Sequence, residues 1–568
     1  MFAANGSGTP SARCGRAGTI WLLAVVVLLL VRDAAAQTQD SLAQVRVAEL
    51  ATAAWVEPAK HHCELEHFVP NEADRAFLSR DYVSAEGLYR KMLADTPSEA
   101  ATVGIVRSEL AQRKLADALE TAEKASAAAP ESAVLMDALG EARLQRGEVD
   151  EAVTALNRAL ALDVCVARVH FDMGRYLGLE GMFASAQHQL DLAYELSPDD
   201  PVIGRTWTIS HAVPPTLEQQ VERMTQLLQD PGLSETRRAA LSAAIRGAEA
   251  REKGGCRIER PVETTTLKMT PLTNGAGLDV ELNGHRQRLK IDTGASGLLI
   301  TMDAAMSAGL VPEAEVKAGG IGDAGAADAF VTHVDRLKIG EMVYRNCMVR
   351  VLEKHNGMDM DGLIGPDVFR DSVVTLDFPK REVRLSPLPA RPQAKPEEAV
   401  ALATTGETAG TAMGRKTPED RYVAPEMKDW TQVYRVGSQL IFPTRIGNAP
   451  LKLFLMDSGA ARGIISPQAA REVTQVTEPT SDRAHVQGLS GPVTAVYQAE
   501  NVVIQFGGVR QVVERMTAID TSEASRWAGV DISGFIGFST LQKLVVSIDY
   551  RDNLVHVVYD PKHTAHGQ

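Results

Sequence analysis

The chain has 568 residues, of which 45% are hydrophobic and 23% are charged, a composition typical of globular proteins. At about 150 residues per domain, this length predicts several domains. The formal net charge of −14, with no run of Lys or Arg, argues against a nucleic-acid partner, because phosphate binding requires basic patches.

The N-terminal residues have the pattern of a targeting segment. Arg13 and Arg16 precede a continuous apolar run, 20–31, and Ala34-Ala35-Ala36 supplies small residues for cleavage. We therefore expect residues 1–36 to be a signal peptide and the protein to be exported, to a bacterial periplasm or as a secreted protein. The alternative is an uncleaved anchor, but this run is too short to span a bilayer comfortably. We expect no stable membrane span after cleavage.

Export permits disulfide bonds, and four cysteines follow the predicted signal peptide: Cys63, Cys165, Cys256 and Cys347. They allow three pairings, among which the sequence does not choose, and their wide spacing is equally compatible with free buried thiols. The first cysteine lies in an N-terminal segment, 37–69, together with three histidines: His61, His62 and His67. This group has no second set of ligands at a recognised spacing, so we expect no metal site.

Residues 70–200 have a helical pattern with a period of about 34 residues, the repeat length of tetratricopeptide (TPR) proteins. Pro130 follows Pro97 by close to one period, and Pro198 follows Pro130 by two. Three small residues also recur one period later: Gly147, Ala152 and Ala159 return as Gly181, Ala186 and Ala193. This pattern resembles about four TPR repeats, in which small residues let paired helices stack. The alternative is a generic array of Ala-rich helical hairpins. Residues 201–255 continue the helical pattern and are expected to cap the array.

Beyond residue 255 the pattern becomes that of β-strands. Residues 277–282 alternate between apolar and polar, Asn283-Gly284 predicts a hairpin turn, and residues 286–291 return toward Asp292. A second hairpin has the same order: strand 439–446, a turn at 447–450, and strand 451–456 leading to Asp457. The stretch 388–425 is rich in Pro, Ala, Thr and Gly and predicts a linker between two β units, 256–387 and 426–562.

In both units the acid is followed by a small hydroxyl residue and a glycine: Asp292-Thr293-Gly294 and Asp457-Ser458-Gly459. Two buried carboxylates brought face to face cannot both ionise, so they share one proton and can act as base and acid. Each acid is followed by a glycine-containing loop, in the first unit Gly319-Gly320-Ile321-Gly322 and in the second Gly488-Leu489-Ser490-Gly491. An apolar-apolar-Gly signature comes next, at a similar interval after each acid: Leu363-Ile364-Gly365 and Phe535-Ile536-Gly537.

This double pattern resembles the active-site motif of aspartic proteases of the retropepsin-like kind. The resemblance implies that Asp292 and Asp457 form a catalytic dyad, that Thr293 and Ser458 are hydroxyl partners that cross between the units, and that the two glycine-containing loops are flaps over an extended peptide. In retropepsins two identical chains each supply one acid. Here the resemblance implies an internal pseudo-dimer of two all-β units behind an all-α TPR-like solenoid; the alternative is that the units do not pair within one chain and the molecule dimerises instead.

The sequence therefore predicts an exported aspartic endopeptidase that acts on peptide or protein substrates, without metal or organic cofactor. Its TPR-like region is expected to recruit substrate or a protein partner. One departure from the family pattern is that Ser296, four residues after the first acid, corresponds to Ala461 in the second unit. The second unit is accordingly expected to bind substrate less well or to serve mainly to complete the dyad. The competing hypothesis is a non-catalytic periplasmic peptide-binding or scaffold protein with degenerate protease units, but the intact acids and hydroxyl residues favour the enzyme.

Overall fold

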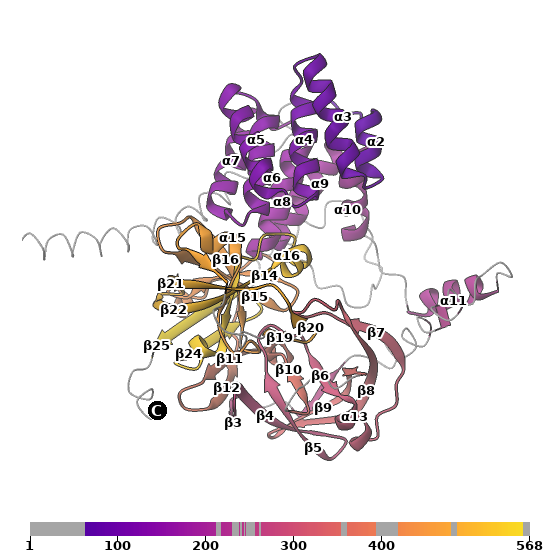
Figure 1. Ribbon diagram of the computed structural model, residues 1–568. Coiled ribbons are helices and arrows are strands. Elements are labelled where there is room, and N and C mark those ends of the chain that lie inside the picture. Colours follow the sequence, from indigo (N-terminus) through magenta and orange to yellow (C-terminus); the bar gives the residue numbers. More distant parts are fainter. Residues whose placement is uncertain are drawn as a thin grey trace, which may run out of the picture. The chain divides into compact units, whose positions relative to one another are not determined.

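The computed structural model (Figure 1) describes residues 63–211, 217–229, 256–260, 263–353, 360–392, 419–478 and 486–559, with four single positions between 238 and 245. The predicted signal peptide and most of the predicted linker lie outside these residues. None of the helices in the described part of the chain is long and apolar enough to cross a membrane.

The N-terminal region is a series of four helical hairpins, which confirms the predicted helical repeats (Figure 1). Small residues at the predicted period, such as Ala118, Ala138 and Ala152, are completely or almost completely buried and let neighbouring helices approach closely. The hairpins are α2 (Glu72–Leu78) with α3 (Tyr82–Asp95), α4 (Glu99–Ala111) with α5 (Leu115–Ala128), α6 (Ala133–Gln145) with α7 (Val149–Leu162), and α8 (Ala167–Glu180) with α9 (Phe183–Leu196). Helices α10 (Pro201–His211) and α11 (Leu217–Leu228) follow.

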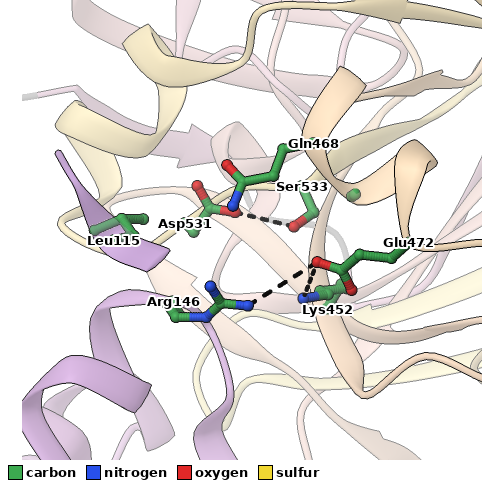
Figure 2. A pocket seen from close by; sticks show the side chains of 8 residues that line it. Leu115, Arg146, Lys452, Gln468, Glu472, Asp531 and Ser533 are labelled. Carbon is green, nitrogen blue, oxygen red and sulfur yellow. Dashed lines mark hydrogen bonds and ion pairs between the residues drawn. The ribbon is translucent and has the colours of Figure 1, made fainter. Parts of the chain in front are cut away.

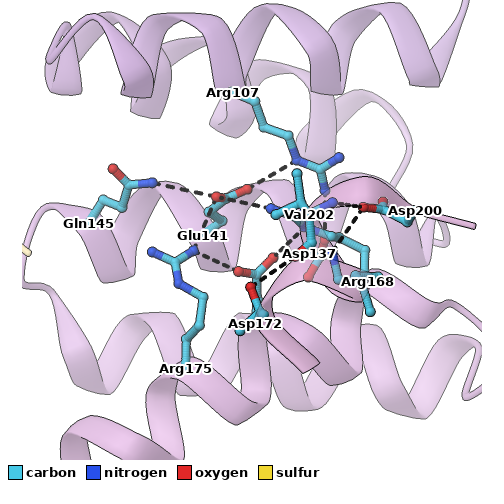
Figure 3. Close-up of polar contacts among 11 residues, drawn as sticks. Arg107, Asp137, Glu141, Gln145, Arg168, Asp172, Arg175, Asp200 and Val202 are labelled. Atoms are coloured by element: carbon cyan, nitrogen blue, oxygen red, sulfur yellow. Dashed lines mark hydrogen bonds and ion pairs between the residues drawn. The ribbon is translucent and has the colours of Figure 1, made fainter. Parts of the chain in front are cut away.

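A network of buried charges joins three successive repeats (Figure 3). Arg107, Glu141 and Arg175 occupy the same position in successive repeats, on α4, α6 and α8. Glu141 accepts hydrogen bonds from Arg107 Nε and Arg175 Nη1, each at 3.2 Å. Asp172 accepts from the same Arg175 nitrogen at 2.8 Å and from Arg168 Nε at 3.2 Å. Because buried charges are costly unless they are paired, Glu141 lies between an arginine of the preceding repeat and an arginine of the following repeat.

The first β unit contains a nine-stranded sheet with the order β1-β9-β6-β10-β5-β4-β8-β7, and β3 pairs with β4. Its strands are β1 (Arg257–Arg260), β3 (Thr270–Leu272), β4 (Gly275–Leu282), β5 (His285–Ile291), β6 (Leu298–Thr301), β7 (Ala314–Ala318), β8 (Ala327–Ile339), β9 (Met342–Leu352) and β10 (Gly362–Ile364). Two short helices accompany them, α13 (Met302–Ser307) and the 3₁₀ helix η2 (Pro366–Phe369).

The second β unit contains an eight-stranded sheet with the order β14-β15-β16-β23-β17-β22-β21-β18 and a two-stranded ribbon, β19-β20. Its strands are β14 (Tyr434–Val436), β15 (Gln439–Ile446), β16 (Leu451–Asp457), β17 (Ile464–Ile465), β18 (Val476–Thr477), β19 (Val486–Gly488), β20 (Gly491–Val493), β21 (Val496–Phe506), β22 (Val509–Ile519) and β23 (Gly534–Gly537). Its helices are η3 (Pro425–Met427), α15 (Pro467–Arg471), α16 (Ser522–Ala528) and α17 (Phe538–Leu541).

A six-stranded sheet is shared by the two units, with the order β13-β25-β24-β11-β12-β2. The units meet where β11 pairs antiparallel with β24, with Val374 opposite Ile548 and a hydrogen bond of 2.9 Å between Thr375 Oγ1 and Ser547 Oγ. The two units therefore pair within one chain, and pairing between chains is not needed to bring them together. The strands of this sheet are β2 (Thr265–Lys268), β11 (Ser372–Asp377), β12 (Glu382–Pro387), β13 (Thr431–Gln432), β24 (Leu544–Asp549) and β25 (Leu554–Tyr559).

All four cysteines that follow the predicted signal peptide form disulfide bonds. Cys63 pairs with Cys165 across 102 residues, and Cys256 pairs with Cys347 across 91 residues. The sequence left open both the pairing and the alternative of free thiols, and the structure excludes the free thiols. The first bond ties the segment before α2 to the start of α8, and the second ties β1 to β9. Because Cys63 is bonded to Cys165, it is not available as a metal ligand beside the neighbouring histidines.

Polar contacts connect the helical repeats to the end of the linker and to the second β unit. Arg421 donates to Glu180 at the end of α8, and the Asp420 carboxylate accepts from the Ser185 amide at 3.0 Å.

Figure 2 shows a small polar pocket, where Arg146 lies 4.0 Å from Glu472 and Lys452 lies 3.0 Å from the same carboxylate. Ser533 Oγ donates to Asp531 in the same pocket at 3.0 Å. Because its charged side chains pair with neighbours in this way, we assign the pocket a structural role.

Candidate active site

Each acid lies at the C-terminal end of a hairpin's second strand, as predicted. Strands β4 and β5 are antiparallel, and Asn283 and Gly284 make the turn between them with φ of 50° and 89°. The second hairpin, β15 with β16, leads to Asp457 in the same way. The apolar-apolar-Gly signatures lie beside the acids, because β10 runs parallel to β5 and β23 runs parallel to β16.

A short helix follows each signature. In the first unit it is the 3₁₀ helix η2 (Pro366–Phe369), and in the second it is the four-residue α-helix α17 (Phe538–Leu541). Strands β11 and β24 begin within a few residues of these helices and continue the chain into the shared sheet.

The hydroxyl residues after the acids bond across the two units. Thr293 Oγ1 donates to the carbonyl of Met456 at 2.8 Å and accepts from the Ser458 amide at 2.9 Å. Ser458 Oγ donates to the carbonyl of Ile291 at 2.9 Å and accepts from the Thr293 amide at 3.0 Å. Both side chains are buried. These four bonds fix the strand ends, and therefore the acids, relative to one another.

The structure brings the carboxyl groups of Asp292 and Asp457 together between these strand ends. The Gly294 amide donates to Asp292 Oδ1 at 2.8 Å, and the Ala460 amide donates to Asp457 Oδ1 at 3.0 Å. Gly459 lies directly against Asp292, since a Cβ atom at position 459 would lie 2.3 Å from Asp292 Oδ2. Only glycine lets the backbone approach the opposite carboxyl this closely.

The environment favours the protonated form of both acids. The pKa of Asp292 is raised to about 7, mainly by burial and next by the charge of Asp457. The Gly294 amide and the Lys290 ammonium group act in the opposite direction and lower it. Burial also raises the pKa of Asp457, against the Ala460 amide and the hydrogen bond with Asp292. Two coupled carboxyls of this kind hold one proton and one negative charge between them over an interval of pH. Such a pair can accept a proton from water and donate one to a carbonyl oxygen.

The two predicted flap loops contact each other. The Ser490 amide donates to the carbonyl of Ile321 at 2.9 Å, and the Ala324 amide donates to the carbonyl of Ser490 at 2.9 Å. The carboxylate of Asp323 accepts from the amide of Thr494 at 2.7 Å and from its hydroxyl at 2.6 Å. The tip of the first loop, Gly319 to Gly322, and the tip of the second, Gly488 to Gly491, are thereby held together by backbone and side-chain bonds.

The two units differ beside the acids. Ser296 Oγ donates to Asp367 Oδ2 at 3.0 Å, and the Gly297 amide donates to Asp367 Oδ1 at 2.9 Å. In the second unit Ala461 and Ser539 take the places of Ser296 and Asp367, so hydroxyl and carboxylate are replaced together. The hydroxyl of Ser296 therefore bonds to Asp367, and the second unit has no equivalent bond at Ala461.

Three further side chains lie at the site and were not predicted from the sequence: Lys290, Asp367 and Gln439. Lys290 Nζ donates to the carbonyl of Gly459 at 2.6 Å, and Gln439 Nε2 donates to the carbonyl of Gly294. One signal was present, because a lysine two residues before the acid interrupts an otherwise apolar strand end. Its acceptor could not be identified, since it belongs to the other unit, 169 residues away.

Parts of the chain are similar to known proteins. Residues 278–371 match the family model described as gag-polyprotein putative aspartyl protease. The chain is 30% identical over 110 residues to the UBA domain-containing protein Mud1 of Schizosaccharomyces pombe; the match covers 19% of this chain and 32% of that protein. The chain thus spans about a third of the length of this relative.

Two solved structures are similar to parts of the chain. An aspartic proteinase from Irpex lacteus is 11% identical with a TM-score of 0.32, over 54% of this chain and all of that one. A thermophilic TPR protein in Thermus thermophilus is 20% identical with a TM-score of 0.22, over 30% of this chain and 95% of that one. The family match covers β4 to η2 and includes Asp292, Thr293 and Gly294. It supports an aspartic protease-like domain in the first β unit, behind a region of helical repeats.

Proposed function

We propose that the protein is an exported aspartic endopeptidase in which Asp292 and Asp457 together activate water for peptide-bond hydrolysis. One observation carries the proposal: two carboxyls from different units face each other at strand ends that are fixed by the crossing bonds of Thr293 and Ser458. A water between the acids loses a proton to the ionised carboxyl and attacks the scissile carbonyl carbon. The protonated carboxyl gives its proton to the carbonyl oxygen, so no covalent enzyme intermediate forms.

We expect the flap loops to cover an extended substrate. Because they pair with each other through backbone groups, a peptide that enters beneath them has to part these bonds or lie under a closed cover. Where the bonds part, the freed backbone groups can bond to peptide groups of a substrate irrespective of its side chains.

Substitution of either acid tests the proposal. Asp292→Asn and Asp457→Asn should each abolish cleavage of an unstructured peptide library, because an amide is neither base nor acid here. Both variants should fold, since each removes one charge from a crowded pair. Asp377→Asn is the matched control: Asp377 also ends a buried strand, but it bonds to Lys380 and Arg384 and not to the pair. A wild-type protein that binds peptides and never cleaves them would instead indicate a non-catalytic scaffold.

The proposal extends to location and recruitment. Residues 1–36 direct export, which mass spectrometry of the mature N-terminus at or near Gln37 checks. The repeats recruit substrate or a protein partner, so removal of residues 70–200 should change the choice among protein substrates and leave cleavage of short peptides. An equal loss of cleavage on protein substrates and on short peptides, together with a lower melting temperature, would indicate instead that the repeats stabilise the second unit.

A further inference from the structure

The backbone carbonyls beside the two acids each accept a side-chain hydrogen bond from the opposite unit. Lys290 on β5 of the first unit donates to the carbonyl of Gly459 at 2.6 Å. Gln439 on β15 of the second unit donates to the carbonyl of Gly294. Each glycine lies two residues after an acid, so these bonds hold the loops that carry the pair. We call the two bonds the cross-unit clasps.

The two clasps start from different positions in equivalent hairpins. Lys290 is paired with Gly277, and Leu455, two residues before the second acid, is paired with Ile441. Two residues before these partners lie Gly275 and Gln439, which are therefore equivalent. The first unit supplies its donor from the second strand, and the second unit supplies it from the first strand.

Gly275 leaves the space that Lys290 uses. A Cβ atom at position 275 would lie 2.5 Å from Lys290 Cε and 3.3 Å from its Cδ. A side chain at this position is therefore incompatible with the observed path of the lysine. Lys290, beside Gly275, thus supplies the hydrogen bond to the opposite unit in the first unit, and Gln439, beside Leu455, supplies it in the second.

Only one of the two clasps is charged. Lys290 is 9% exposed, and its ammonium group acts on both carboxyls of the pair. Tyr550 also interacts electrostatically with Asp292, and Asp367, Arg370 and Arg435 interact with Tyr550 in turn. The amide of Gln439 gives the same geometry without charge.

We propose that Lys290 is a positioning residue for the Asp292/Asp457 pair, which holds the Gly459 backbone against Asp292 and supplies the positive charge that stabilises the carboxylate of the pair. The pH dependence of activity that follows rests on the proposed hydrolytic function. The effect of Lys290 on the ionisation of the two acids does not depend on that function.

The sign of the effect follows from Coulomb's law. A positive charge favours ionised carboxyls, so Lys290 opposes the rise that burial causes and moves both ionisations of the pair to lower pH. Its removal should move both limbs of the activity profile to higher pH by about one unit.

Two variants separate the bond from the charge. Lys290→Met removes both and should raise the two apparent pKa values of the pair. The double variant Lys290→Leu/Gly275→Gln copies the second unit, restores an uncharged donor to Gly459, and should recover the melting temperature while the pKa values remain raised. Lys452→Met is the control, because Lys452 is a buried lysine on the corresponding strand β16 whose partner is Glu472 at 3.0 Å. It should leave the titration of the pair unchanged.

The decisive measurement is the titration of the aspartate carboxyl carbons by ¹³C NMR in the full-length protein, with Asp292→Asn to assign the pair. Raised apparent pKa values of the pair in both Lys290 variants support the proposal. An unchanged titration in Lys290→Met overturns it, and so does a double variant that titrates like the wild type, because the bond alone would then set the ionisation. The NMR result holds whether or not the protein cleaves peptides. The pH profile of kcat/KM on a peptide substrate tests the link to hydrolysis separately.

Discussion

Thr293 and Ser458 each bond to the backbone of the opposite unit with both the donor and the acceptor capacity of the hydroxyl group. Each accepts from the other's amide, at 2.9 and 3.0 Å, and each donates to a carbonyl one residue before the opposite acid. The arrangement is symmetric although the residues differ, because the additional methyl group of threonine does not take part in the bonds.

Replacement of Thr293 by Val keeps the shape of the side chain and removes its oxygen. The buried Ser458 amide and the Met456 carbonyl then lose their partner, which should lower the free energy of unfolding by about 1–3 kcal/mol. Thr293→Ser keeps both bonds and should cost less. Chemical denaturation of the two variants checks this. Equal stability of Thr293→Val and the wild type would show that the crossing bonds do not hold the units together.

The activity of the proposed enzyme should be bell-shaped in pH. The acidic limb appears where both carboxyls are protonated, and the upper limb appears where the shared proton is lost. Since burial and Asp457 raise the pKa of Asp292 to about 7, the upper limb should lie near neutral pH and the optimum below it. Measurement of kcat/KM from pH 3 to 9 tests this. A profile with a single limb would contradict a shared proton.

The same acids should affect stability. A group whose folded pKa is raised stabilises the fold below its unfolded pKa, near 4, and this contribution is lost as pH rises through the folded value, near 7 for Asp292. Asp292→Asn removes the cost of ionising this buried carboxyl group. Its free energy of unfolding relative to the wild type should therefore increase between pH 4 and pH 8, on the order of 4 kcal/mol.

Asp279→Asn provides a control of opposite sign. The hydrogen bond from Arg288 lowers the pKa of Asp279, so this carboxylate stabilises the fold above its unfolded pKa, and the benefit is lost as pH falls. The variant should lose stability relative to the wild type as pH rises from 3 to 7. Urea denaturation at several pH values measures the free energy of unfolding of both variants. If both variants changed in the same direction with pH, the opposite pKa shifts assigned to Asp292 and Asp279 would be wrong.

The bond between Asp323 and Thr494 should keep the flap loops paired. Asp323→Ala removes the acceptor for the amide and the hydroxyl of Thr494, so the neighbouring amides of Ala324 and Ser490 should exchange with deuterium faster. Asp328→Ala, in the same hairpin but bonded to Lys317, is the matched control. Hydrogen exchange read by mass spectrometry distinguishes them. Because the Thr494 bonds lower the pKa of Asp323, the pairing should persist under mildly acidic conditions.

Much of this architecture could be predicted because local patterns encode it. Asn283-Gly284 predicts the turn that directs β5 to Asp292, and the regular return of small residues such as Gly147 and Gly181 predicts the helical hairpins. The crossing hydroxyls followed from the resemblance of the Thr293 and Ser458 motifs. In each case the informative residues are neighbours in the sequence or recur at a fixed interval.

The remaining features depend on long-range contacts. Ser296 and its partner Asp367 are 71 residues apart, and the flap bond of Asp323 reaches Thr494 across 171. The two disulfides join cysteines whose spacing carried no pattern. Lys290 was visible as an exception in an apolar strand, but its acceptor depends on how the units meet, which no local pattern specifies.

The antiparallel pairing of β11 with β24 joins the two units into one sheet, and both units belong to one polypeptide chain. In an assembly of identical chains, every substitution appears on both sides of the symmetry axis. Here a substitution changes one side alone, as Ser296 against Ala461 and Lys290 against Leu455 already show. We therefore expect a polypeptide bound across the axis to meet unlike neighbours at its two ends, so that its two possible directions differ in binding free energy.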